Sequence, residues 1–360
     1  MKILIIQQKM IGDVLISTII CENIKRNLPD VEIHYLINCH TVPVVINNPF
    51  IDQVVLFKAD YKKNKLAFYQ FLKDIKEEKY HVVLDVYCKL ESNLISLFSQ
   101  APLKASLKKW YSSFIYTHHV YKPKNRKRGT GMAIEDRLLF LAPILPNLNE
   151  AVKRPKIYLT EDETCAARTF LGAHNITGSE PIIMLNILGS HPNKTYPLPY
   201  MAEVIDLIAK ITDATLLFNY IPCQHKQALE LYDLCNDTTK KQIKIDAFAS
   251  SLRLFLALVH HCNAVIGNEG GAINMAKALG VPTFSIFSPW ITKAAWDTFS
   301  DASNVAVHLN DYRPEEMYGK SKKELKKNNL DLYKRFTPAY FMLLLTDFLK
   351  DISVIPKVNP

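Results

Sequence analysis

The stretch Gly267-Asn-Glu-Gly-Gly-Ala-Ile-Asn274 lies between two apolar runs, at 263–266 and 282–287. This order predicts a strand, a glycine-rich turn, a helix and a second strand. Glycines at 270 and 271 allow a ligand to approach the backbone closely, and the N-terminus of the following helix attracts phosphate. In an open α/β sheet such a loop lies at the carboxyl end of a strand, where ligands bind. A glycine-rich turn without a ligand is the alternative interpretation.

The same alternation of strands and helices continues through all 360 residues, a length that favours two domains. In the first half, the pattern predicts strands at 2–8, 31–37, 51–57 and 81–86, and helices at 14–27, 65–79, 89–99 and 132–141. In the second half, it predicts strands at 181–187, 214–218, 243–245, 263–266 and 282–287, and helices at 161–173, 199–211, 250–261 and 338–350. The sequence therefore predicts an α/β fold with doubly wound parallel sheets. The proline-rich connection at 143–155 divides it into domains at 1–150 and 151–335, followed by a C-terminal helix and tail at 336–360.

Composition only partly restricts the range of possible binding partners. The chain has 44 Lys and Arg against 35 Asp and Glu, and this excess permits an acidic partner such as a nucleotide, a phospholipid surface or a nucleic acid. Seven scattered cysteines without a Cys-x-x-Cys pair indicate a reducing compartment. No apolar stretch is long enough for a spanning helix, so a cytoplasmic protein is expected. No His, Cys or Asp cluster has metal-ligand spacing, so no metal is expected.

Asp13 follows the first predicted strand, at the mouth of its turn. A carboxylate there would repel a phosphate at the place where the helix dipole favours an anion. Two roles remain. The residue is either a general base that takes a proton from a substrate hydroxyl, or the N-cap of the helix.

The loop Leu188-Gly-Ser-His-Pro-Asn-Lys194-Thr-Tyr-Pro197 takes the equivalent place in the second half, after a buried strand and before a helix. The backbone of Gly189 and the hydroxyl of Ser190 can donate hydrogen bonds to phosphate oxygens, and Lys194 can supply a positive charge. Because a second phosphate-competent loop follows at 267–274, we interpret both loops as one binding site.

The segment Lys122-Pro-Lys-Asn-Arg-Lys-Arg128 concentrates five basic residues. It is either a solvated loop or a contact for an acidic ligand.

Together these motifs resemble the lipopolysaccharide heptosyltransferases, in the same order and spacing over nearly the whole chain. The resemblance is carried by Ile11-Gly-Asp13-Val-Leu, by Gly189-Ser with Lys194-Thr-Tyr-Pro197, and by Val265-Ile-Gly-Asn-Glu-Gly-Gly271 with Ala276-Lys-Ala-Leu-Gly-Val-Pro-Thr283. It implies a GT-B fold, in which two Rossmann-like domains face each other across a cleft and the C-terminal helix packs back on the N-terminal domain. It also implies an inverting glycosyltransferase that needs no metal or cofactor and uses ADP-heptose as donor.

The resemblance assigns roles to individual residues. Asp13 matches the base, with Gly12 beside it on the acceptor side, and Lys194 matches the lysine that holds the diphosphate. The other donor-binding positions are Gly189, Ser190, Asn268, Glu269, Gly270, Gly271 and Asn274. From their charge and position, Lys124, Arg126, Lys127 and Arg128 are assigned to the acceptor. The implied acceptor is an acidic glycolipid such as the lipopolysaccharide core. Peripheral contact with the cytoplasmic face of a membrane is expected, and no nucleic acid.

The chain departs from the family pattern at several positions. Asn274 stands where His is frequent, Glu269 where Asp is commoner, and Tyr196 where Trp is usual. Gln224 and His225 are the nearest matches to an acidic ribose contact. These departures leave two alternatives open, a non-catalytic paralogue that binds a nucleotide sugar and another GT-B enzyme with a different nucleotide sugar.

Overall fold

A computed structural model describes residues 1–123, 130–352 and 354. It consists of two compact units, Met1–Tyr158 and Leu159–Pro360. The division falls slightly after the predicted boundary at residue 150. No helix in the described part of the chain is long and apolar enough to cross a membrane.

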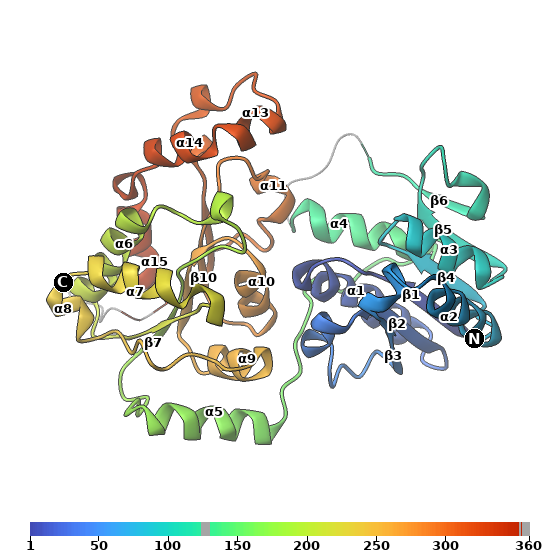
Figure 1. The fold of residues 1–360 in the computed structure, drawn as a ribbon, viewed down its shortest axis with the longest axis horizontal. Coiled ribbons are helices and arrows are strands. Elements are labelled where there is room, and N and C mark those ends of the chain that lie inside the picture. The colour runs from blue at the N-terminus through green and yellow to red at the C-terminus, as the bar shows by residue number, and fades with distance from the viewer. Residues whose placement is uncertain (124–129, 353, 355–360) are drawn as a thin grey trace. The chain divides into compact units, whose positions relative to one another are not determined.

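The described residues of the first unit form a six-stranded parallel sheet in the order β3-β2-β1-β4-β5-β6. The strands are β1 (Lys2–Ile6), β2 (Glu32–Asn38), β3 (Gln53–Phe57), β4 (Val82–Asp85), β5 (Leu103–Leu107) and β6 (His118–Val120). The helices are α1 (Ile11–Asn27), α2 (Lys65–Glu77), α3 (Leu90–Phe98) and α4 (Met132–Leu138). Helices α2 and α3 pack together beside one face of the sheet, and α1 with α4 lies beside the other (Figure 1). The strand order reverses between β1 and β4, and the carboxyl ends of these two strands mark the place where a ligand binds in such a sheet.

The second unit has five described strands, all parallel, in the order β11-β10-β9-β7-β8. They are β7 (Ile182–Asn186), β8 (Thr215–Phe218), β9 (Ala264–Asn268), β10 (Thr283–Ile286) and β11 (Asn304–Val307). Helices α6, α7 and α15 cover one face and α9 and α10 the other (Figure 1). The helices of this unit are α5 (Glu161–Ala173), α6 (Leu198–Ile211), α7 (His225–Leu234), α8 (Asp237–Lys240), α9 (Leu252–His260), α10 (Gly271–Ala278), α11 (Lys293–Trp296), α12 (Leu309–Tyr312), α13 (Lys322–Lys327), α14 (Asn329–Arg335) and α15 (Met342–Asp351). Here the order reverses between β7 and β9, which carry the two predicted phosphate loops.

Helix α1 begins earlier than the sequence predicts, at Ile11 rather than Val14. The N-cap position belongs to Met10, which has an extended backbone and no side-chain capping bond. Asp13 therefore lies inside the first turn, and the N-cap interpretation of Asp13 is wrong. From Gly12 to Ile24 the helix is buried all round, as expected for a helix that packs between a sheet and further helices.

Three other local predictions differ from the structure. The segment 243–245 is not a strand, because only Ile243 makes an isolated bridge, to Leu216. Strands β5 and β6 were not predicted, since polar residues such as Lys104 and Ser106 interrupt their short apolar pattern. Strand β11 was also missed. It has only four residues, and its register with β10 is set by tertiary pairing.

The C-terminal helix α15 packs in the core of the second unit, whereas the sequence interpretation placed it on the N-terminal domain. Leu345, Phe348 and Leu349 of α15 belong to the apolar core of the second unit, where α15 contacts α6. Phe348 lies against Phe284 of β10, with ring centroids 5.7 Å apart. This packing leaves the apolar face of α15 buried within its own unit.

We predict that Phe348→Ala lowers the free energy of unfolding of the second unit by about 3–5 kcal/mol, because it leaves a cavity in this core. Leu343→Ala on the same helix is the control, since Leu343 is 83% exposed and its loss should cost no more than about 0.5 kcal/mol. Chemical denaturation followed by circular dichroism measures both. Equal midpoints for the two variants would show that α15 is not part of the core.

Candidate functional site

In the second unit, the loops after β7 and β9 are joined by one buried side chain. The amide nitrogen of Asn268 donates to the carbonyls of Asn186 and Ile187, at 3.0 and 2.9 Å, and its oxygen accepts from the backbone N–H of Tyr196 at 2.7 Å. Asn186 returns a bond of 2.6 Å to the carbonyl of Asn268. Asn268 is fully buried and its amide is occupied by these bonds. Although it was predicted to contact the donor, its observed contacts are with the loop backbone.

Two glycines make this close packing possible. A β-carbon at Gly267 would lie 2.4 Å from the carbonyl oxygen of Asn186, and the φ of Gly267 is +135°. A β-carbon at Gly189 would lie 2.5 Å from the carbonyl oxygen of Lys194. Neither position has room for a side chain, because the neighbouring atoms belong to the backbone.

The loop after β7 folds into a short 3-10 turn, η5 (Pro192–Lys194). It is tied at both ends. The N–H of Gly189 donates to the hydroxyl of Thr195 at 3.1 Å, and the carbonyl of Asn193 accepts from Ser288, Trp290 and Asn329. These bonds fix the backbone on either side of Lys194.

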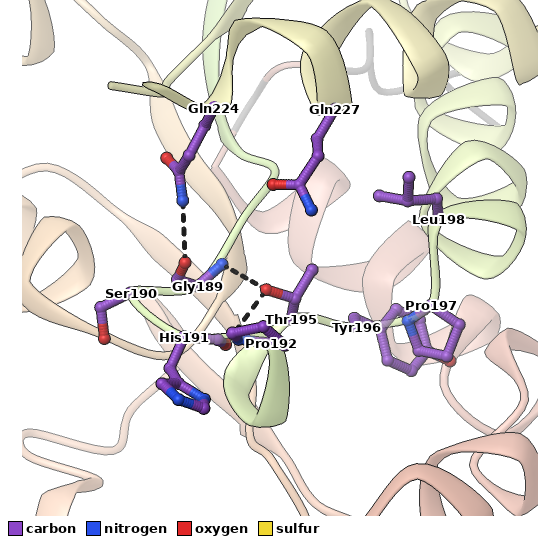
Figure 2. A pocket seen from close by; sticks show the side chains of 10 residues that line it. All are labelled: Gly189, Ser190, His191, Pro192, Thr195, Tyr196, Pro197, Leu198, Gln224 and Gln227. Carbon is purple, nitrogen blue, oxygen red and sulfur yellow. Dashed lines mark hydrogen bonds between the residues drawn. The ribbon is translucent and has the colours of Figure 1, made fainter. Parts of the chain in front are cut away.

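Around this loop lies a pocket of about 250 Å³ (Figure 2). Its polar lining includes the predicted residues Gly189 and Ser190, the latter exposed. Gln224 closes one side by donating to the carbonyl of Gly189 at 3.0 Å, and Gln227 lies beside it. Gln227 was missed, although its spacing of three residues from Gln224 places both on one face of the chain as it enters α7.

An ion pair joins the two loops. The ammonium nitrogen of Lys194 lies 3.8 Å from Oε2 of Glu269. Glu269 is only 7% exposed, and its Oε2 has no hydrogen-bond partner among the described residues. Burial raises the pKa of the Glu269 carboxyl, while the ammonium groups of Lys194 and Lys277 lower it. The net effect is a raised pKa of the Glu269 carboxyl.

The glycines at 270 and 271 lie at the start of α10, as the sequence predicts. Gly270 precedes the helix and Gly271 is its first residue. Asn274 is buried one turn later, and its amide donates to the carbonyl of Gly270 at 3.2 Å. The first backbone N–H groups of a helix have no acceptor within that helix, and they lie at the positive end of its dipole. The start of α10 therefore presents such groups.

In the first unit, a second pocket of about 240 Å³ lies where the strand order reverses. Gln7 follows β1 and Val86 follows β4, and both line it. The buried carboxylate of Asp13 forms part of the wall, and Arg137 contacts it at 2.7 Å. Lys9 contacts the same oxygen at 3.2 Å. The charge of Asp13 is thus compensated by two cations. Gly12, beside it, is buried in the helix.

This pocket carries four lysines, Lys9, Lys89, Lys109 and Lys122, in addition to Arg137. The sequence interpretation placed the acceptor contacts instead on Lys124, Arg126, Lys127 and Arg128, which lie outside the described residues. A signal for two of the observed lysines does exist in the sequence, because Lys9 and Lys89 each follow the carboxyl end of a predicted strand, whereas Lys109 follows β5, which was not predicted. Arg137 gives no such signal, since it reaches Asp13 from 124 positions away.

Among the described residues, no group of three or more His, Cys, Asp and Glu side chains gathers as a metal site would require. The seven cysteines are free.

Two parallel α/β units, each with a polar pocket beyond the carboxyl ends of its strands, are typical of the class of two-domain glycosyltransferases. The sequence pattern of glycosyltransferase family 9 (heptosyltransferase) matches residues 68–325. The chain belongs to this family, and it is a glycosyltransferase.

Individual relatives agree with this assignment. The chain is 23% identical over 300 residues to lipopolysaccharide heptosyltransferase 1 of Campylobacter coli, covering 80% of this chain and 84% of the relative. The structure of a family 9 glycosyltransferase from Veillonella parvula superposes with a TM-score of 0.74 at 18% identity, over 93% of this chain and 97% of the other. An E. coli heptosyltransferase with ADP superposes with a TM-score of 0.68 at 14% identity, over 98% and 100% of the two chains. The fold is therefore that of the GT-B heptosyltransferases, as predicted.

The raised pKa of Glu269 predicts a specific pH dependence. Folding favours its protonated form, so the stability that this group contributes is present at low pH and is lost as the pH rises above the ordinary range of a carboxyl group. Glu269→Gln removes this loss. Relative to the native chain, the variant should gain stability as the pH rises from about 4 to 7, by about 1.4 kcal/mol per unit of pKa elevation.

Glu163→Gln is the control with the opposite sign. The hydrogen bond from Arg253 lowers the pKa of Glu163, so this carboxylate stabilises the fold at higher pH and its loss should cost more as the pH rises. Denaturant unfolding at several pH values measures both differences. A pH-independent difference for Glu269→Gln would contradict the assigned direction.

Proposed function

We propose that this protein is an inverting heptosyltransferase that moves heptose from ADP-heptose to a hydroxyl of an acidic glycolipid. The second unit would hold the donor and the first unit the acceptor. The observation that carries the proposal is the buried Asp13 carboxylate in a pocket lined by four lysines. The same pocket therefore contains a carboxylate that can take a proton from a hydroxyl and cations that can bind an acidic acceptor.

Asp13 would act as the general base. It accepts the proton of the acceptor hydroxyl while the hydroxyl oxygen attacks the anomeric carbon, and the bond from that carbon to the diphosphate breaks on the opposite side. ADP leaves with the electron pair of the broken bond. Arg137 and Lys9 would keep the carboxylate oriented, because both contact the same oxygen atom, Oδ1.

Lys194 would stabilise the negative charge that develops on the leaving diphosphate. Its backbone is fixed by the bonds around η5, and its ammonium nitrogen lies 3.8 Å from Oε2 of Glu269, beyond hydrogen-bond distance. The N–H groups at the start of α10 and the exposed hydroxyl of Ser190 would bind further phosphate oxygens. Glu269 Oε2, a buried acceptor without a hydrogen-bond donor, would accept from a hydroxyl of the donor sugar. In this mechanism the protein's own cations take the part that a metal plays in other transferases.

Proteins of similar structure and sequence support the substrate classes. One similar structure is that of an E. coli heptosyltransferase with ADP, and another is of one with ADP-2-deoxy-2-fluoro heptose. The curated relative is a lipopolysaccharide heptosyltransferase. These names favour ADP-heptose and a lipopolysaccharide precursor among nucleotide sugars and glycolipids.

We predict that Asp13→Asn lowers kcat for heptosyl transfer by about 10²- to 10⁴-fold, because the base is lost while the shape of the side chain is kept. ADP-heptose affinity should stay unchanged. Glu22→Gln is the matched control, since Glu22 is a buried carboxylate on the same helix that pairs with Arg26. It should keep native turnover. Release of ADP in the presence of acceptor gives the rates, and native turnover by Asp13→Asn would refute its role as base.

We also predict that Lys194→Ala weakens ADP-heptose binding by about 10- to 100-fold and lowers kcat, because a charge-assisted contact to the diphosphate is removed. Lys194→Arg should recover part of the affinity. Lys210→Ala, at the exposed end of α6 in the same unit, is the control and should bind as the native chain does. Calorimetric titration measures the affinities. Native affinity in Lys194→Ala would remove this residue from the donor site.

A further inference from the structure

The first unit has a loop rich in aromatic residues beside its lysine-lined pocket. It connects β5 to β6 and continues to Tyr121. Trp110 is 90% exposed and Phe114 80% exposed, and Tyr111 and Tyr121 are also exposed. Large exposed aromatic side chains are costly in water and are uncommon as a group on a free surface. We call Trp110, Tyr111, Phe114 and Tyr121 the aromatic patch.

The structure holds this patch in place. Trp110 and Tyr111 contact edge to face, with ring centroids 5.7 Å apart. The loop between them and β6 is tied by a hydrogen bond of 3.0 Å between Ser113 and His119. Buried Ile115 anchors its far side. The exposed rings are therefore presented by a loop whose own backbone is fixed.

Lysines accompany the rings. Lys108 lies over the ring of Tyr121, 5.4 Å from its centroid, and Lys109 lies 5.7 Å from that of Tyr111. Between Ser92 and Pro123 the chain contains four lysines and no Asp or Glu. Aromatic rings together with lysines and without acidic residues match the interface of an anionic bilayer, where rings lie at headgroup depth and ammonium groups pair with phosphates.

The patch is also adjacent to the acceptor-side pocket. Leu107 at the end of β5 and Lys109 line that pocket, and the ammonium of Lys109 donates to the carbonyl of Cys88 on the opposite wall. The first residues of the aromatic loop are thus part of the pocket wall. A surface bound through Trp110 would lie next to the pocket mouth.

We propose that the aromatic patch, with Lys108, is a docking surface for an anionic lipid bilayer. The proposed surface does not include the basic segment at 124–128, and it requires neither donor nor acceptor. Trp110 and Phe114 enter the headgroup region, and Lys108 contacts lipid phosphate. The lipid surface is thereby brought to the pocket that carries Asp13.

The test is sedimentation of the full chain with vesicles that contain no glycolipid. The native chain should bind vesicles of phosphatidylcholine with phosphatidylglycerol, and Trp110→Ala with Phe114→Ala should bind about tenfold more weakly. The matched control is Tyr318→Ala with Leu343→Ala, which removes two equally exposed apolar side chains from the second unit, at 90% and 83% exposure. This control should bind as the native chain does. Equal binding by both double variants would overturn the proposal.

Two further experiments test the charge of Lys108 and the depth of Trp110 in the bilayer. Lys108→Glu should weaken binding to the anionic vesicles and leave the weaker binding to pure phosphatidylcholine unchanged. Brominated lipids should quench the emission of Trp110, whereas Trp290 and Trp296 are partly buried in the other unit. Trp110→Phe should keep binding and lose this quenching. If the native chain ignores vesicles but self-associates through Trp110, the patch is an interface between copies and the proposal is wrong.

Because these assays contain no sugar substrate, they are independent of the proposed transfer reaction. Loss of vesicle binding with native ADP-heptose affinity would separate the docking surface from the donor site. Normal vesicle binding by an inactive chain would leave the docking surface intact and refute only the proposed reaction.

Discussion

The second unit depends on the side chain of Asn268. Its amide joins the end of β7, the end of β9 and the backbone at Tyr196 through three hydrogen bonds. A buried amide whose nitrogen and oxygen are both hydrogen-bonded stabilises one arrangement of the loops. A shift of the loops would leave a polar group unpaired, at a cost of about 1–3 kcal/mol. These hydrogen bonds fix the loop that carries Lys194 and the loop that leads into α10. The loops after β7 and β9 are therefore held by a residue that is itself fully buried.

Both pockets lie beyond the carboxyl ends of parallel strands, where ligands bind in such sheets. The first is lined by segments that follow β1, β4 and β5, and the second by segments that follow β7 and β8. The two pockets have different linings. The first contains a compensated carboxylate among lysines, which suits an acidic acceptor and proton removal. The second is lined by the loop after β7 and by the amide side chains of Gln224 and Gln227. The same fold thus carries two different pockets.

Much of this arrangement can be predicted from the sequence, since glycine turns and strand–helix alternation are local patterns. Gly189, Lys194 and Glu269 were found because loops after strands are visible in the sequence. The direction of a side chain is not visible there. Asn268 was expected at the ligand, yet the neighbouring strand turns it inward. Arg137 was missed because its approach to Asp13 depends on packing between α1 and α4. The C-terminal helix was misplaced for the same reason, since an apolar face does not specify its partner.

Binding of the donor is the most direct measure of the central claim that the second unit is a site for ADP-heptose. The full chain is titrated calorimetrically with ADP-heptose, UDP-glucose and GDP-mannose under the same conditions. The account predicts saturable binding of ADP-heptose at one site, displaced by ADP, and weaker binding of the other two. Saturable binding of UDP-glucose or GDP-mannose with none of ADP-heptose or ADP would contradict it.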